Sequence, residues 1–174
     1  LKGLTFQSSW FDELLSVTQS SPGQSFSGII TTLQSDPHPP LFYLGLHYWM
    51  SIFGYTETVA RLFTALAGIG GVAAMYWLGK ACLNRSAGYI ASLFTALNYF
   101  NLYYSQEVRP YVFLFLFTAL SYGFLIRLLR TPGKKYIVLY GLSTALMLYS
   151  HYYGLIHLLT QCICLFILLA FDNI

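Results

Sequence analysis

The side chains in this sequence that could do acid–base or ion-binding chemistry lie in short polar gaps between long apolar runs. Five of the six acidic residues occupy these gaps: Asp12, Glu13, Asp36, Glu57 and Glu107. Ionisable groups are costly near a hydrocarbon layer, so a function is the first hypothesis where they are kept, although a solvated loop position costs little. What chemistry they can do depends on whether these gaps meet on one side of a membrane.

The adjacent acids Asp12 and Glu13 follow the aromatic residues Trp10 and Phe11. Two neighbouring carboxylates at a membrane surface are suited to binding a metal ion or to removing a proton from a substrate. The alternative is that they only favour the first turn of a short helix, where negative charge interacts well with the helix dipole. The sequence alone leaves both interpretations open.

Three prolines surround a second candidate pair, in the sequence Asp36-Pro37-His38-Pro39-Pro40. Proline fixes its own φ and favours extended backbone at the residue before it. Side chains two residues apart on extended backbone point the same way, so Asp36 and His38 are predicted to act together. They would be two ligands, or an acid and a cation. The alternative is an ordinary solvated pair just before a helix.

Two arginines are candidates for binding phosphate, because a planar guanidinium matches phosphate geometry. Arg109 lies in the gap 105–110, where its alternative is to pair with Glu107. Arg61 has a matching alternative in Glu57, four residues earlier on the same helical face. His151, in the gap 150–153, adds an imidazole, although a histidine at a helix end is more often structural.

The apolar runs between these gaps predict an all-α protein, a polytopic membrane helical bundle. The chain has 174 residues, of which 56% are hydrophobic and 9% charged, with a mean hydropathy of +0.59. About 20 apolar residues are needed to cross the hydrocarbon core, and the runs do not alternate as barrel strands would. The predicted transmembrane helices are 59–83, 87–104, 111–129, 136–150 and 154–171.

The basic residues predict how this bundle is oriented. Six of the nine Lys and Arg residues flank the gaps 79–86 and 131–133, and short loops rich in Lys and Arg stay cytoplasmic. The gaps 105–110 and 150–153 then lie outside, together with the five acids.

This orientation requires that residues 41–53 do not cross the membrane. The segment has only 13 residues and is rich in aromatic side chains, which predicts an interfacial helix. Residues 1–40 are predicted to be an outer loop with short amphipathic helices at 11–19 and 25–34.

Four motifs together resemble those of a known family. They are Trp-Phe-Asp-Glu (10–13), Asp-Pro-His-Pro-Pro-Leu-Phe-Tyr (36–43), Phe-Gly-Tyr-Thr-Glu-Thr-Val-Ala-Arg-Leu (53–62) and Tyr-Ser-Gln-Glu-Val-Arg-Pro-Tyr (104–111). The chain resembles the bacterial branch of the dolichyl-phosphate-mannose–protein mannosyltransferase family. That family includes the aminoarabinose transferases of lipid A and belongs to the GT-C membrane glycosyltransferases.

The resemblance implies an enzyme at the outer face of the cytoplasmic membrane. It would move a sugar from a polyprenyl-phosphate donor to a protein, lipid or glycan acceptor, with no nucleic-acid partner. Asp12 would be the catalytic base with Glu13 beside it, and Glu107 would support catalysis or orient the acceptor. The implied substrate-binding residues are Asp36, His38, Arg61, Arg109, Tyr111 and His151.

A divalent metal is the one cofactor that the resemblance leaves open. The aminoarabinose transferases have Glu-Lys-Pro where this chain has Pro37-His38-Pro39, so their metal-ligating Glu falls on Pro37. The nearest acid, Asp36, is one position earlier.

Two other functions also stay open. A transporter or flippase of lipid-linked sugars would need helix breaks and polar residues at mid-membrane depth, which the sequence does not predict within 59–129. A non-catalytic assembly subunit would have its acids dispersed. The chain lacks an initiator Met and ends just after an apolar run, so we expect an N-terminal part of a larger protein, inactive by itself.

Overall fold

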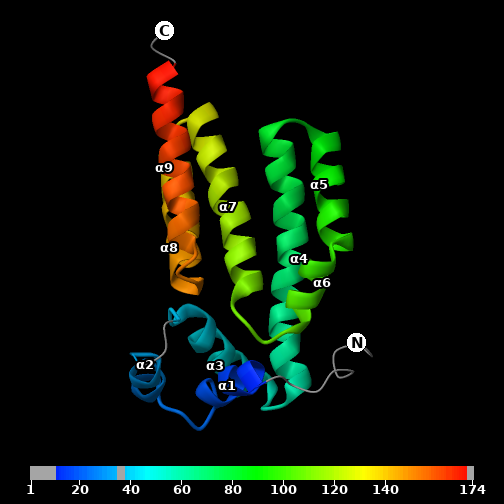
Figure 1. Cartoon of the computed structure of the whole chain (residues 1–174), viewed down its shortest axis with the longest axis vertical. Helices are drawn as coiled ribbons and strands as arrows, with labels where there is room; N and C mark the ends of the chain where they lie inside the picture. The colour runs from blue at the N-terminus through cyan, green and yellow to red at the C-terminus, as the bar shows by residue number, and fades with distance from the viewer. Residues whose placement is uncertain (1–10, 35–37, 172–174) are drawn as a thin grey trace.

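The computed structural model describes residues 11–34 and 38–171, and every regular element within them is a helix (Figure 1). The all-α prediction is therefore confirmed. In chain order the helices are α1 (Phe11–Gln19), α2 (Phe26–Gln34), α3 (Leu41–Phe53), α4 (Glu57–Cys82), α5 (Arg85–Leu97), α6 (Tyr99–Gln106), α7 (Tyr111–Arg130), α8 (Lys134–Ser150) and α9 (Gly154–Phe171).

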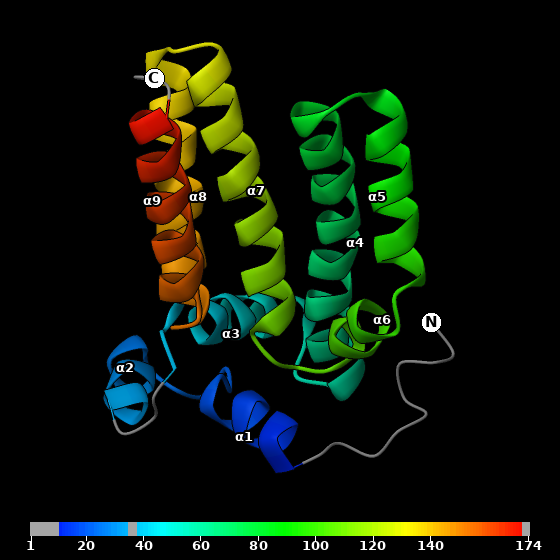
Figure 2. The ribbon, with the colours of Figure 1, turned by 45° about the horizontal axis from the view of Figure 1, so that its top comes forward.

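The helices α4, α5, α7, α8 and α9 run side by side as a bundle (Figures 1 and 2). Helix α4 contacts α5, α6 and α7, and α7 packs in turn against α8. Three helices of the described chain, α4, α7 and α9, are long and apolar enough to cross a membrane. Helix α8 has 17 residues, at the short end of the range of about 17–25 for a membrane span.

The predicted span 87–104 is divided in the structure at Asn98. Helix α5 ends at Leu97 and α6 begins at Tyr99, while Asn98 itself has an extended backbone. The Asn98 Oδ1 accepts hydrogen bonds from the backbone N–H groups of Phe100 (2.9 Å) and Asn101 (3.2 Å). An asparagine that satisfies first-turn donors in this way favours a new helix start over helix continuation. The expectation of unbroken helices within 59–129 is wrong at this position.

Helices α1 to α3 gather at one end of the bundle, and α3 lies across that end instead of running along the other helices (Figure 2). Its inner face is buried in a core with α2, α4 and the loop before α7. That core consists of Ile29, Leu33, Phe42, Tyr43, Leu46, Met50, Ala60 and Val108. The opposite face of α3 exposes Tyr48 and Ile52, which are available to a membrane surface. Helix α3 is thus anchored by protein contacts on one side.

The two basic gaps meet at the other end of the bundle. Arg130, the last residue of α7, donates hydrogen bonds to the carbonyl oxygens of Ala81 and Cys82 at the end of α4, the second at 2.6 Å. A cation is favourable there because the last carbonyl groups of a helix carry partial negative charge. The basic gaps therefore lie at one end of the bundle and the acidic residues of the described chain at the other, as predicted. Which end faces the cytoplasm stays a prediction.

Candidate active site

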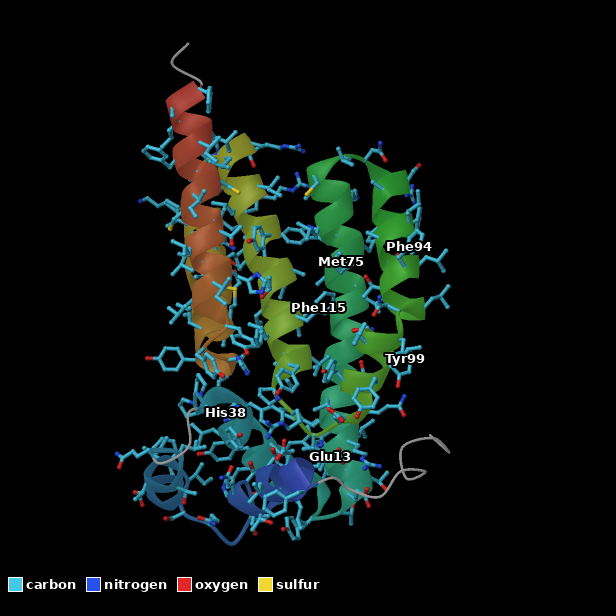
Figure 3. All side chains as sticks on the ribbon, viewed as in Figure 1. Glu13, His38, Met75, Phe94, Tyr99 and Phe115 are labelled. Atoms are coloured by element: carbon cyan, nitrogen blue, oxygen red, sulfur yellow. The ribbon has the colours of Figure 1, made fainter. Side chains whose placement is uncertain are left out.

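Charged and aromatic side chains from distant parts of the sequence surround one cavity at the α1–α3 end of the bundle. The cavity has a volume of about 260 Å³ and is lined by Asp12, Glu13, Tyr103, Tyr104, Glu107, Arg109 and Tyr111. We call it the charged cavity. Figure 3 places Glu13 at this end of the molecule. Asp12 and Glu107 thus share one cavity, as the sequence interpretation required.

Glu13 and Arg61 form a buried ion pair behind the charged cavity. Arg61 donates from Nη2 to Glu13 Oε2 at 3.0 Å and from Nε to Oε1 at 3.4 Å. The backbone N–H of Val108 donates to the same Oε1 at 2.9 Å. The two residues are only 2% and 3% exposed. A buried, bidentate pair of this kind fixes geometry, and here it ties α1 to α4 and to the loop before α7.

Arg61 also forms the alternative pair that its sequence spacing suggested. Its Nη2 lies 2.9 Å from Glu57 Oε1, one helical turn away. The guanidinium is therefore shared between two carboxylates and has little access to solvent. This geometry favours a positioning role for Arg61 over contact with a substrate phosphate.

Asp12 and Arg109 form a second ion pair, which borders the charged cavity. The Asp12 side chain is 65% exposed, and its Oδ2 lies 3.7 Å from Arg109 Nη2. The Arg109 guanidinium lies over the Tyr111 ring, 5.7 Å from its centroid. Such a loose, accessible pair contributes little to stability and can rearrange when an anion arrives. Arg109 therefore pairs with Asp12 here, and the predicted alternative partner Glu107 lies elsewhere on the cavity wall.

Glu107 lies in the cavity wall beside a residue that the sequence interpretation missed. Its neighbour there is Tyr103, four residues earlier, which lines the same cavity and interacts with the Glu107 carboxylate. That spacing is the signal that could have identified Tyr103. The position of both depends on close packing of α6 on α4, where a methyl group at Gly68 would overlap Ser105 Oγ.

His38 and His151 lie next to each other, although one precedes α3 and the other follows α8. Their ring centroids are 5.6 Å apart, and the His151 ring is 5.4 Å from that of Tyr111. Figure 3 places His38 at the same end of the bundle as Glu13. The two histidines thus extend the row of polar side chains from Arg109 across Tyr111.

His151 is held in one tautomer by its surroundings. The ring is 2% exposed, and its Nδ1 accepts a hydrogen bond from the backbone N–H of Tyr153 at 3.1 Å. Burial above all, followed by the charges of His38 and Arg109, lowers the pKa of His151 to about 4. At neutral pH the ring is therefore uncharged with its proton on Nε2, so it can donate a hydrogen bond.

The remaining predicted residue, Asp36, lies outside the described residues. The divalent-metal hypothesis involves this residue and stays a prediction. Among the described residues, no group of three or more His, Cys, Asp or Glu side chains could hold a metal ion.

Comparison with known families identifies the class of protein. A family model described as dolichyl-phosphate-mannose-protein mannosyltransferase matches residues 37–172, which is most of the chain. The chain belongs to this family. It is therefore a membrane glycosyltransferase of the GT-C type, and the family implies a lipid-linked sugar donor. The match begins after the Asp12-Glu13 motif. No significant match was found among curated proteins or among solved structures.

Proposed function

We propose that the charged cavity is where a sugar passes from a polyprenyl-phosphate donor to an acceptor hydroxyl at the outer face of the cytoplasmic membrane. One observation carries this proposal: an exposed carboxylate (Asp12), a second carboxylate (Glu107) and a guanidinium (Arg109) line the same cavity. Family membership supports glycosyl transfer from a lipid carrier, and Arg109 suits the carrier phosphate.

The proposed reaction assigns one role to each of these groups. Asp12 takes the proton of the acceptor hydroxyl while the acceptor oxygen bonds to the anomeric carbon of the sugar. The bond from that carbon to the phosphate oxygen breaks, and its electron pair leaves with the phosphate, whose charge Arg109 stabilises. Glu107, beside Tyr103 in the cavity wall, orients the acceptor.

Glu13 receives a different role from its neighbour. Glu13 belongs to the cavity lining, but its carboxylate is 2% exposed and both of its oxygens already accept hydrogen bonds, from Arg61 and the Val108 N–H, so Asp12 is the better base. We therefore assign Glu13 and Arg61 to positioning the loop that carries Glu107 and Arg109.

The substrate-binding part of the proposal extends along the row of aromatic and imidazole groups. The buried His151 ring contacts His38 and Tyr111 and acts through them, and Tyr111 lines the charged cavity. A contribution from Asp36 to substrate or divalent-metal binding belongs to this proposal too. No step depends on a metal.

The decisive experiment is Asp12→Asn in the intact membrane protein, assayed with a radiolabelled polyprenyl-phosphosugar. We expect transfer to fall by about 10²–10⁴-fold, the usual contribution of a general base. Glu57→Gln is the matched control, because it removes a carboxylate at the same end of the bundle but outside the cavity lining. Undiminished transfer by a folded Asp12→Asn protein would refute the assignment.

One observation favours the transporter alternative, namely the helix break at Asn98. A flippase would move a fluorescent lipid-linked sugar across reconstituted vesicles in the absence of any acceptor, whereas the proposed transferase would not. The assembly-subunit alternative required dispersed acids, and the shared cavity of Asp12 and Glu107 argues against it.

A further inference from the structure

Four polar side chains form a hydrogen-bonded network between α7, α8 and α9, outside the lining of the charged cavity. Tyr140 on α8 donates from its OH to Gln161 Oε1 on α9 at 2.8 Å. Gln161 Nε2 donates in turn to Ser121 Oγ on α7 at 2.9 Å, and Ser121 Oγ lies 2.8 Å from Thr144 Oγ1 on α8. Ser121 and Gln161 are fully buried. We call these four residues the core network.

The core network lies near the middle of the bundle, where the three helices run side by side (Figure 2). Ser121 follows Tyr111, the first residue of α7, by ten residues, or about 15 Å along the helix. The hydrocarbon core is about 30 Å thick, so Ser121 lies near its centre when Tyr111 marks one boundary. No water reaches such a depth, and hydrogen bonds between side chains then join helices in a fixed direction.

Helix α9 depends on this network for its position. Of its 18 residues, only Gly154 and Gln161 are buried. Gly154 lies close against the end of α8, where an added Cβ would be 2.9 Å from the carbonyl oxygen of Met147. A buried polar contact in an otherwise apolar helix interface is a known device for fixing register. Gln161 is the residue of α9 that is suited to this task.

The start of α9 is joined directly to the loop that contains His151. The backbone N–H of Gly154 donates to the carbonyl oxygen of His151 at 2.8 Å. The His151 ring lies 5.6 Å from the His38 ring and 5.4 Å from the Tyr111 ring. A slip of α9 by one residue would move this loop by about 1.5 Å, enough to disturb both ring contacts.

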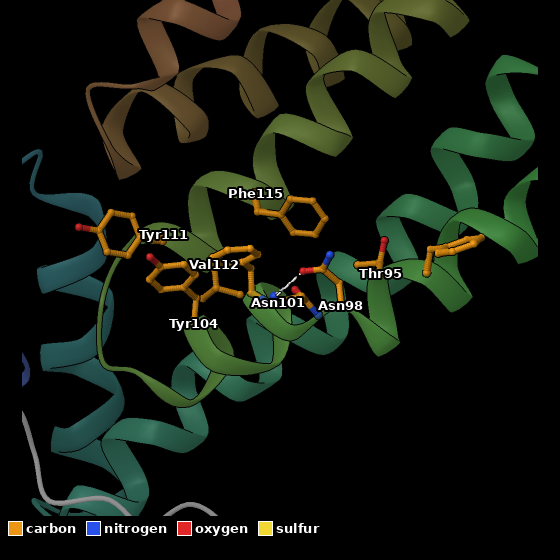
Figure 4. Close-up of a pocket in the computed structure, with 9 residues that line it drawn as sticks. Thr95, Asn98, Asn101, Tyr104, Tyr111, Val112 and Phe115 are labelled. Carbon is orange, nitrogen blue, oxygen red and sulfur yellow. Dashed lines mark hydrogen bonds between the residues drawn. The ribbon is translucent and has the colours of Figure 1, made fainter.

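Tyr111 connects the His151 loop to the proposed transfer site. It lines the charged cavity and also a second cavity of about 370 Å³ between α5–α6 and α7 (Figure 4). Tyr104 lines both cavities too, and its ring centroid is 5.0 Å from that of Tyr111. The position of the Tyr111 ring therefore shapes the wall that the two cavities share.

We infer that Gln161 is a distal positioning residue of the proposed transfer site. Its hydrogen bonds fix α9 against α7 and α8, α9 fixes the His151 loop, and the His151 ring holds Tyr111 in the cavity wall. The core network thus serves geometry more than stability. The inference rests on the proposed function, because it names a residue that the same site needs.

Labelling of the intact protein with diethyl pyrocarbonate, quantified at each histidine by mass spectrometry, tests the first step. Neutral imidazole is the reactive form, and the pKa of His151 is lowered to about 4, so at pH 7 its burial limits the reaction. We expect Gln161→Leu to raise the rate at His151 about tenfold, since losing one or two hydrogen bonds favours local opening. The rate at His47 should not change. Thr160→Leu is the matched control, because Thr160 is an exposed neighbour that bonds within its own helix.

A transfer assay in native membranes, which supply the acceptor, tests the second step. We expect the rate of Gln161→Leu at saturating radiolabelled polyprenyl-phosphosugar to fall by about 10–100-fold, because a displacement of about 1 Å can cost 100-fold. Thr160→Leu should transfer at the wild-type rate.

A fourfold variant separates positioning from stability and keeps the test decisive if Gln161→Leu does not fold. It combines Ser121→Ala, Tyr140→Phe, Thr144→Val and Gln161→Leu, which together remove every polar group of the core network. Replacing all partners by apolar groups of similar shape can be nearly neutral. We expect an unfolding midpoint close to that of the wild type, together with fast labelling of His151 and slow transfer.

Several results would overturn the inference. They are unchanged labelling of His151 in Gln161→Leu, an equal increase at His47 or in Thr160→Leu, and a fourfold variant that either fails to fold or regains wild-type labelling and transfer. Wild-type transfer by Gln161→Leu despite faster labelling also removes the inference and keeps the transferase. If the wild type transfers no sugar while the labelling changes as expected, the transferase fails and the dependence of the His151 loop on Gln161 stands.

Discussion

Two ion pairs lie side by side at the α1–α3 end of the bundle, and they differ in burial. Glu13 and Arg61 are enclosed by protein and joined by two hydrogen bonds, whereas Asp12 is 65% exposed and stands 3.7 Å from Arg109. The first pair, which we call the buried pair, is almost closed to solvent and its charged groups are occupied by protein partners. The second, the cavity pair, can exchange its partner for a substrate. Of these two adjacent carboxylates, Glu13 therefore supports the structure and Asp12 is the candidate for the chemistry.

The largest effect should come from breaking the buried pair. Glu13→Ala leaves the buried Arg61 guanidinium with Glu57 alone and the buried Val108 N–H without its acceptor, and breaking a buried ion pair typically costs about 3–5 kcal/mol. We expect a large loss in the free energy of unfolding, measured by denaturant titration in detergent. Asp12→Ala should change this free energy by less than about 1 kcal/mol, because the Asp12 carboxylate is 65% exposed and its contact with Arg109 is long, at 3.7 Å. Equal losses in the two variants would contradict the comparison.

The cavity pair should instead show its effect in substrate binding. Arg109→Ala removes the cation proposed to hold the carrier phosphate, and hydrogen bonds to charged groups contribute about 1.5–3 kcal/mol. We expect the affinity for polyprenyl phosphate, measured by fluorescence competition, to fall by about 10–100-fold with little loss of stability. Arg85→Ala at the opposite end of the bundle is the control. Unchanged affinity in Arg109→Ala would remove Arg109 from the site.

The pH dependence of stability tests the environment of His151, which lies next to Tyr111 at the same end of the bundle. Its pKa is lowered from 6.5 to about 4, so the unfolded chain binds more protons than the folded one between these values. The contribution of neutral His151 is fully present above about pH 6.5 and is lost as pH falls toward 4. We expect the thermal midpoint to drop more between pH 7.5 and pH 5 in the wild type than in His151→Gln. Identical drops would mean that His151 titrates normally.

The smallest expected effect on stability comes from the helix break at Asn98. Asn98→Ala removes the side chain that caps α6, at a typical cost of about 1 kcal/mol. Asn98→Asp should retain most of this stability, because it keeps the accepting oxygen. Differential scanning calorimetry of both variants measures the difference. A neutral Asn98→Ala substitution would show that the break does not depend on this cap.

Much of the bundle could be predicted from the pattern of apolar runs. The expected helices at 59–83, 111–129 and 154–171 correspond closely to α4, α7 and α9, since long apolar stretches have few alternatives in a membrane. The break at Asn98 was not predicted, because hydropathy averages over one polar residue. Whether that residue starts a new helix depends on its capping bonds and on the cavity beside it.

Most residues of the candidate site could be predicted from the sequence, but which of them support the structure and which face the cavity could not. Asp12, Glu107, Arg109 and Tyr111 were all identified from polar gaps and from the family resemblance, and they line one cavity. Tyr103 and Tyr104 were missed, because aromatic residues are too common in this chain to stand out.

The sequence by itself determined that this is a helical membrane protein of a glycosyltransferase family, with its acids apart from most of its basic residues. Only the tertiary structure decided that Glu13 is buried against Arg61 and Val108 while its neighbour Asp12 is exposed. The physical reason is that the accessibility of a carboxylate depends on the elements packed around it. Here those elements, α4 and the loop before α7, come from distant parts of the chain.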